Sequence, residues 1–159
     1  MTASLLAAPG PAEDSAPLAE NGGGWTIAEY RSVLGWTVTW GGGRPLLDLG
    51  HGMVAVTAPR PLAVGLAERL HRLDATGPVF AVDGARPYWV FLADPNDEVN
   101  AGLHLPRGVE ILGCPQRIPV PVEVPRSPAL RWIVPPDTRR RWLPTLAAVA
   151  LAAARTGRQ

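Results

Sequence analysis

Lysine is absent from this chain of 159 residues, and Cys114 is its single cysteine. A lone cysteine excludes an internal disulfide and any metal site built from several thiolates, so we expect Cys114 to be a small buried residue. The apolar run Leu143–Ala154 covers about 12 residues, too few to span a bilayer. No basic region precedes the short apolar stretch Ser4–Pro9, so we expect no signal peptide and a cytoplasmic protein without membrane contact.

Charge is scarce as well, since only 18% of the residues are charged. All fifteen basic residues are arginines, which a GC-rich genome explains, although arginine also forms the better fork for phosphate and carboxylate groups. The net charge is +1, but the first 24 residues carry three acids and no base, which leaves an excess of four positive charges in the remainder. This excess is milder than the basic stripe of a dedicated nucleic-acid-binding protein.

The abundant residues indicate one folded domain with many turns. Hydrophobic residues make up 47% of the chain, which favours a folded core, and there are 18 prolines and 17 glycines. Residues 1–24 are rich in alanine, proline, glycine and acids and end in three glycines, which is typical of a disordered leader. We therefore predict a single domain over residues 25–155.

Three helices are expected. Thr26 and Glu29 have the spacing of a capping box, and Gly35 ends the apolar helical pattern that follows them. Prolines open a second helix, which we predict over residues 59–73. The third helix is predicted over residues 139–154.

Seven strands are expected between these helices. They cover residues 36–40, 52–57, 78–82, 87–93, 108–112, 118–124 and 130–134. Asp83 and Gly84 mark a hairpin between two of them, and Pro119 and Pro121 make the strand at 118–124 an edge or irregular strand. Strands with two or three interspersed helices predict an α+β fold with a mixed or antiparallel sheet.

Four stretches carry a resemblance through their order and spacing. They are Ala28–Val38 (AEYRSVLGWTV), Gly77–Leu92 (GPVFAVDGARPYWVFL), Gly108–Pro121 and Arg131–Pro136 (RWIVPP). Over about residues 25–150 the chain resembles the N-terminal domain of bifunctional DNA primase–polymerases, in the archaeo-eukaryotic primase superfamily. It is most similar there to the small stand-alone versions found in GC-rich bacteria.

The resemblance implies a primase–polymerase-like fold but argues against the polymerase reaction. Active members place two carboxylates one residue apart on a strand, a histidine on the hairpin and a third carboxylate later, and clustered carboxylates hold two divalent cations. Here the strand at 52–57 has no acid, and the histidine position reads Pro87 or Tyr88. Only Glu110 stands at the third position. We therefore predict no catalytic residue, no metal and no cofactor.

Glu110 has two readings. It is a relict carboxylate of the family site, or it lies on the solvated face of an edge strand with Val109 and Ile111 facing inwards. Asp48 and His51 are a further candidate pair for metal or proton chemistry, with loop capping as the alternative. The other histidines, His71 among them, are expected to be structural.

Arginines supply the candidate binding residues. The nucleic-acid or anion-binding candidates are Arg44, Arg86, Arg117, Arg139, Arg140 and Arg141. Arg44 follows three glycines, which could form a backbone nest for phosphate or simply a flexible hairpin or connection. Arg139–Arg141 are expected at a helix start, where the helix dipole disfavours positive charge, so helix stability does not explain them.

These observations leave three functions open, one of which is an enzyme of another type whose Asp48, His51 and Glu110 would have to converge in one pocket. The first is a non-catalytic primase–polymerase-like domain that acts as a binding or regulatory module through a protein partner or self-association. The alternative is a protein that binds nucleotides or single-stranded nucleic acid without polymerase activity. The six tryptophans fit a core and interface role, with base stacking as the second reading.

Overall fold

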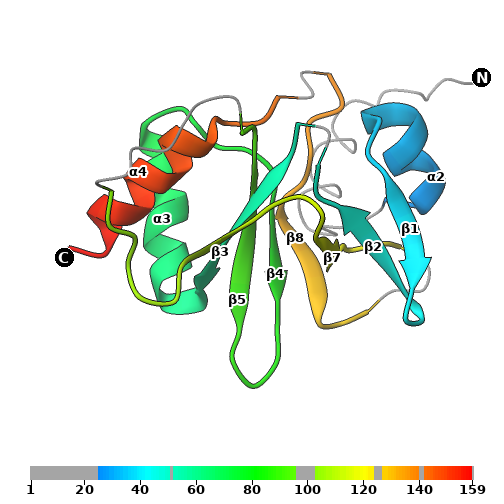
Figure 1. The fold of residues 1–159 in the computed structure, drawn as a ribbon, viewed down its shortest axis with the longest axis horizontal. Coiled ribbons are helices and arrows are strands. Elements are labelled where there is room, and N and C mark those ends of the chain that lie inside the picture. Colours follow the sequence, from blue (N-terminus) through cyan, green and yellow to red (C-terminus); the bar gives the residue numbers. More distant parts are fainter. Residues whose placement is uncertain (1–24, 51, 96–102, 124–126, 140–141, 159) are drawn as a thin grey trace, which may run out of the picture.

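The computed structural model describes residues 25–50, 52–95, 103–123, 127–139 and 142–158. The predicted leader at 1–24 lies outside these residues. The fold is α+β, as expected, with two sheets and helices arranged in layers (Figure 1). Among the described residues, none of the helices combines the length and the hydropathy that a membrane span requires.

The larger sheet has five strands in the order β6-β3-β5-β4-β8, and all neighbours are antiparallel. Its strands are β3 (Val54–Pro59), β4 (Val79–Val82), β5 (Tyr88–Ala93), β6 (Glu110–Leu112) and β8 (Leu130–Val134). The smaller sheet has the order β1-β2-β7 and is also antiparallel. It contains β1 (Val38–Gly41), β2 (Arg44–Asp48) and β7 (Arg117–Pro119). Of the two predicted sheet types, the antiparallel one is therefore observed.

Helices α3 (Arg60–Arg72) and α4 (Leu146–Thr156) cover one face of the five-stranded sheet (Figure 1). Strand β3 shows how its side chains divide, because Val56 and Ala58 pack towards these helices while Ala55 points to the opposite face. Both faces of the central strands are covered. This explains why β5 reads as one continuous apolar run rather than an alternating one.

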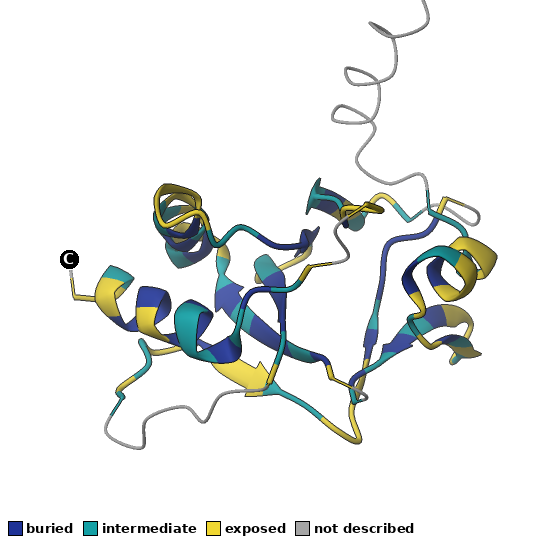
Figure 2. Cartoon of the chain, turned by 90° about the horizontal axis from the view of Figure 1, so that it is seen from above, coloured by how far each residue is buried: buried dark blue, intermediate teal, exposed yellow. Residues whose placement is uncertain are grey.

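The opposite face of the large sheet packs against the small sheet. Their shared core contains side chains from both sheets: Val38, Leu47, Ala55, Phe80, Val90, Leu92, Ile118 and Trp132. Figure 2 shows buried positions, in dark blue, along the strands where the layers meet. The molecule thus has two apolar cores, one on each side of the five-stranded sheet.

The predicted N-terminal helix is confirmed. It consists of α2 (Ile27–Glu29) and the wider turn η1 (Tyr30–Leu34). The backbone N–H of Glu29 donates to Thr26 Oγ1 at 3.1 Å, and the backbone N–H of Thr26 donates to Glu29 Oε2 at 3.2 Å, which completes the capping box. Gly35 ends the helix with φ +72°, a left-handed conformation that glycine adopts without strain.

Strand β2 was not predicted, because residues 41–45 read as a loop. Gly41 pairs with Arg44, so only Gly42 and Gly43 form the turn between β1 and β2. Both glycines have positive φ, +61° and +78°, which is the pattern of a tight two-residue hairpin turn. The three glycines therefore belong to a hairpin, which was the alternative to a phosphate nest before Arg44.

The last helix starts later than predicted. It begins at Leu146, and the hydroxyl of Thr145 caps it by accepting the N–H of Ala148 at 3.1 Å. Arg139 lies in a turn well before this cap, so the expectation that it opens the helix is wrong. The unfavourable contact with the helix dipole therefore does not exist.

Two smaller expectations also change. The strand predicted over 118–124 stops at Pro119, because Pro119 and Pro121 have no N–H to donate to a ladder, and it lies at a sheet edge as expected. Cys114 is exposed rather than buried. It lies in the connection between β6 and β7, outside any strand whose side chains would alternate between the core and the solvent.

Candidate ligand-binding site

Glu110 lies on the edge strand β6, opposite Thr57, and its side chain is exposed. Of its neighbours, Val109 is buried as expected, but Ile111 is 37% exposed. The expectation that both face inwards fails because Val109 precedes the strand. Its N–H donates to Pro106 O in a turn, so the alternation of β6 does not include it.

Asp48 lies on β2 in the small sheet, whereas Glu110 lies in the large sheet. Asp48 pairs across the ladder with Arg117, and Arg117 Nε lies 2.9 Å from Asp48 Oδ1 in an ion pair. His51 is outside the described residues. Within the part of the chain that the structure covers, no three histidine, cysteine or acidic side chains gather closely enough to hold a metal.

The strand at residues 52–57, which was noted for its lack of an acid pair, carries apolar side chains into a packed core. Ala55 is fully buried and Met53 is 6% exposed, and both belong to the core between the two sheets. Leu92 pairs with Ala55 across the ladder and is also fully buried. This region of the inner face is therefore filled by hydrocarbon.

The candidate arginines come from separate elements. Arg44 starts β2, Arg86 lies in the exposed connection between β4 and β5, and Arg117 is engaged with Asp48. Arg139 is exposed after β8, and Arg140 and Arg141 lie outside the described residues. The described arginines do not share one surface element.

Arg44 lines a pocket of about 580 Å³ between the two sheets. Apolar side chains make up most of its walls, among them Pro45, Tyr88 and Leu130. Asp83 also lines it and lies 3.6 Å from Arg131 Nε, a half-exposed ion pair. Surface pairs of this kind contribute little to stability.

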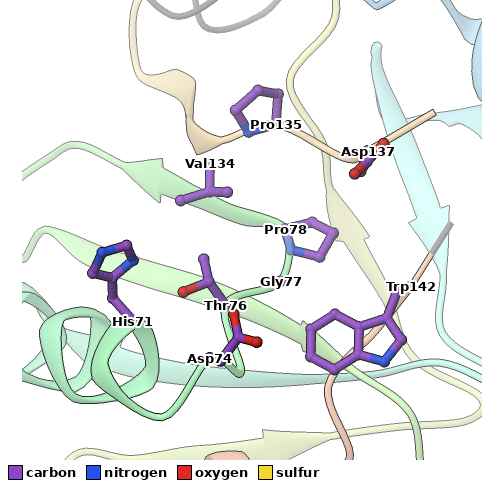
Figure 3. Close-up of a pocket in the computed structure, with 9 residues that line it drawn as sticks. All are labelled: His71, Asp74, Thr76, Gly77, Pro78, Val134, Pro135, Asp137 and Trp142. Carbon is purple, nitrogen blue, oxygen red and sulfur yellow. The ribbon is translucent and has the colours of Figure 1, made fainter. Parts of the chain in front are cut away.

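A second pocket, of about 740 Å³, lies beside the C-terminal end of α3. Nine residues from three segments line it: His71, Asp74, Thr76, Gly77, Pro78, Val134, Pro135, Asp137 and Trp142 (Figure 3). Its volume falls in the range of ordinary ligand pockets, which are mostly apolar with a few polar groups that orient the ligand. We call it the α3–β8 pocket.

Asp74 occupies an unusual place in this pocket. Its φ is +55°, and it is the one described residue other than glycine with a positive φ. It follows Leu73, the cap of α3, at the position where helices most often place glycine. Its carboxylate also lies at the negative end of the helix dipole. A glycine at this position would avoid both the left-handed backbone strain and the unfavourable charge at the helix end.

Trp142 forms the other side of the α3–β8 pocket. It is 46% exposed, although a buried indole would contribute far more to stability. Figure 3 shows the carboxylate of Asp74 pointing towards the six-membered ring of Trp142. Pro78 and Pro135 add apolar surface to the walls.

Thr76 and Asp137 contribute further polar groups to the walls. The hydroxyl oxygen of Thr76 is shielded from solvent and has no hydrogen-bond partner in the described part of the chain. An unsatisfied buried hydroxyl costs about 1–3 kcal/mol. Asp137 accepts the backbone N–H of Arg139 at 2.9 Å. The pocket therefore concentrates several features that the stability of the fold does not require.

No protein-family model, curated protein or solved structure matches the chain. The function has therefore to be inferred from the pockets. The sequence predicted no pocket here, because His71 was expected to be structural and the six tryptophans were read together as core and interface residues, with base stacking as the second reading. One signal was available: the segment Leu73–Gly77 (LDATG) places an aspartate where a glycine or asparagine normally ends a helix.

Proposed function

We propose that this chain is a non-catalytic, primase–polymerase-like binding module whose ligand is a nucleotide or a single-stranded nucleic acid. The observation that carries the proposal is the half-exposed indole of Trp142 on the wall of the α3–β8 pocket. Aromatic side chains that face a groove bind bases by stacking, which contributes about 1–3 kcal/mol per base.

Charge near the pocket supports this ligand class. Arg139, Arg140 and Arg141 directly precede Trp142 in the sequence. The backbone of Arg139 is bound to Asp137, a residue of the pocket wall, which keeps this arginine near the pocket. Arginine is a strong partner for phosphate, and a base on the indole would have its phosphates attracted by this segment.

The inner face of the large sheet supports binding without polymerisation. In the family that the chain resembles, metal-binding carboxylates stand on a strand that corresponds to residues 52–57. Here Met53 and Ala55 pack into the core between the sheets, and residues 52–57 include no carboxylate. A module with this core would hold a nucleic acid but would not supply the two metal ions of nucleotidyl transfer.

Binding of a fluorescent single-stranded oligonucleotide at low salt, measured by anisotropy, tests the proposal. We expect Trp142→Ala to weaken binding by about 5- to 150-fold, which corresponds to the loss of one stacked base. Trp40→Ala is the matched control, because Trp40 is 54% exposed on β1 and is not part of the pocket. We expect it to bind as the unaltered chain does.

Salt dependence tests the role of the arginines. The triple variant Arg139→Ala, Arg140→Ala and Arg141→Ala should bind more weakly and with a shallower dependence on salt, because fewer counterions are released. If the unaltered chain does not bind at low salt, the proposal is wrong. If Trp142→Ala and Trp40→Ala lose the same amount of oligonucleotide affinity, the α3–β8 pocket is not the binding site.

Association with a protein partner or with a second copy stays a prediction. The large apolar side chains that are exposed among the described residues are spread over several elements, with Val64 and Leu73 nine positions apart on α3 and its cap: Trp40, Val64, Leu73, Ile111, Trp142 and Leu151. Single exposed apolar residues are ordinary on protein surfaces. A mass measurement in solution, with and without the oligonucleotide, tests self-association directly.

A further inference from the structure

The carboxylate of Asp74 adds a selective element to the α3–β8 pocket. No hydrogen bond or ion pair engages this carboxylate within the described residues, and its side chain points towards the ring of Trp142 (Figure 3). Asp74 adopts a left-handed backbone conformation, which costs free energy for a residue other than glycine. Its negative charge also lies at the end of α3 where the helix dipole disfavours it. Backbone strain of this kind is concentrated at ligand sites.

The chemistry of a carboxylate restricts the bases it can accept. It has two acceptor oxygens and no donor, so it pairs with two donors that lie side by side. Guanine alone among the common bases presents such an edge, with N1–H next to the 2-amino group. Adenine and cytosine place a ring nitrogen acceptor beside their amino group, and uracil and thymine place a carbonyl on each side of N3–H. A carboxylate repels these acceptors.

We infer that the α3–β8 pocket selects guanine, which stacks on Trp142 while its N1–H and 2-amino group donate to the two oxygens of Asp74. This inference rests on the proposed nucleotide binding. A base against the indole has one edge turned to Asp74, because that carboxylate points at the ring from the side of α3 (Figure 3).

A small cation is the competing occupant for the same carboxylate. An ammonium or guanidinium group also pairs with an acid beside an aromatic ring. The volume of about 740 Å³ and the proline surfaces of the wall fit a planar base better than a slender alkyl cation. Agmatine is therefore a suitable probe for the cationic alternative.

Calorimetric titration of the whole chain at low salt with GMP, IMP, AMP, CMP, UMP and agmatine tests the inference. IMP keeps N1–H but lacks the 2-amino group, so it removes one of the two donors and nothing else. We expect GMP to bind about tenfold or more tightly than IMP, and more tightly than the other nucleotides, because one charge-assisted hydrogen bond is lost.

Asp74→Asn is the matched variant, because asparagine tolerates the left-handed backbone but replaces one acceptor by a donor. We expect the ratio of GMP to IMP affinity to fall close to one in this variant. Trp142→Ala should weaken all nucleotides together. If Asp74→Asn does not fold, the comparison of GMP and IMP affinity in the unaltered chain still tests the inference.

The outcomes distinguish a failure of the proposed nucleotide binding from a failure of the guanine inference alone. If no nucleotide and no oligonucleotide binds, the proposed function and the guanine inference are both wrong. If nucleotides bind but GMP and IMP bind equally, or if Asp74→Asn keeps the preference, only the guanine inference is overturned. Agmatine binding in competition with GMP and at equal or greater affinity would also overturn it.

Discussion

Tyr30 provides the sharpest test of how the core between the sheets is held together. Its side chain is fully buried, and its ring stacks between Trp25 and Trp36, with centroid distances of 5.5 and 5.6 Å. The hydroxyl donates to the backbone oxygen of Pro121 and accepts the indole N–H of Trp132, the latter at 3.0 Å. Tyr30→Phe keeps the stack and removes both hydrogen bonds.

We expect Tyr30→Phe to lower the free energy of unfolding by about 2–4 kcal/mol. The substitution leaves a buried carbonyl and a buried indole N–H without a partner, and each such group costs about 1–3 kcal/mol. The lower part of the combined range applies because phenylalanine no longer has a hydroxyl to desolvate. With a urea dependence of about 2 kcal/mol per M, the midpoint should fall by about 1–2 M.

Urea unfolding followed by tryptophan fluorescence measures this change. Tyr88→Phe is the matched control, because the chain has only two tyrosines and the Tyr88 hydroxyl makes no hydrogen bond within the described residues. We expect Tyr88→Phe to change the free energy of unfolding by less than about 0.5 kcal/mol. A Tyr30→Phe effect as small as that of Tyr88→Phe would refute the two buried hydrogen bonds as a source of stability.

Two further results are expected. Burial raises the pKa of the Tyr30 hydroxyl in the folded chain, so the unfolded chain loses this proton first, near pH 10. The contribution of Tyr30 to the free energy of unfolding should therefore be fully present below about pH 10. Above it, the free energy of unfolding should fall by up to about 1.4 kcal/mol per pH unit. Urea midpoints from pH 8.5 to 11.5 should show this decline in the unaltered chain and a flatter one in Tyr30→Phe, and the absence of lysine keeps other titrations few. Asp74→Gly should raise the free energy of unfolding by about 0.5–1 kcal/mol, because glycine adopts φ +55° without strain and removes the charge from the end of α3. A destabilised Asp74→Gly variant would mean that the carboxylate has a structural role and would weaken its assignment to a ligand.

Elements with strong local signals were predicted well. The capping box of Thr26 and Glu29 and the stop at Gly35 involve residues within one turn of each other, and both were found. The hairpin between β4 and β5 and the strand β8 also matched, since apolar runs of these lengths between turn residues leave few alternatives.

The errors fall where distant residues decide. Strand β2 exists because its backbone pairs with β1 on one side and β7 on the other, and β7 comes about 70 residues later in the chain. A run such as RPLLD carries no strong strand signal by itself, and Pro45 argues against one. The late start of α4 depends on Thr145, a cap that the long apolar pattern conceals.

The sequence by itself determined the fold class, the approximate positions of most elements and the lack of an acid pair at residues 52–57, because these depend on composition and near neighbours. Only the tertiary structure decided which tryptophan is core and which is available to a ligand. Trp132 is 4% exposed because two sheets close over it, whereas Trp142 is 46% exposed beside the end of α3. Burial depends on contacts between segments far apart in the chain, so the approach of Asp74 to Trp142 could not be read from local patterns.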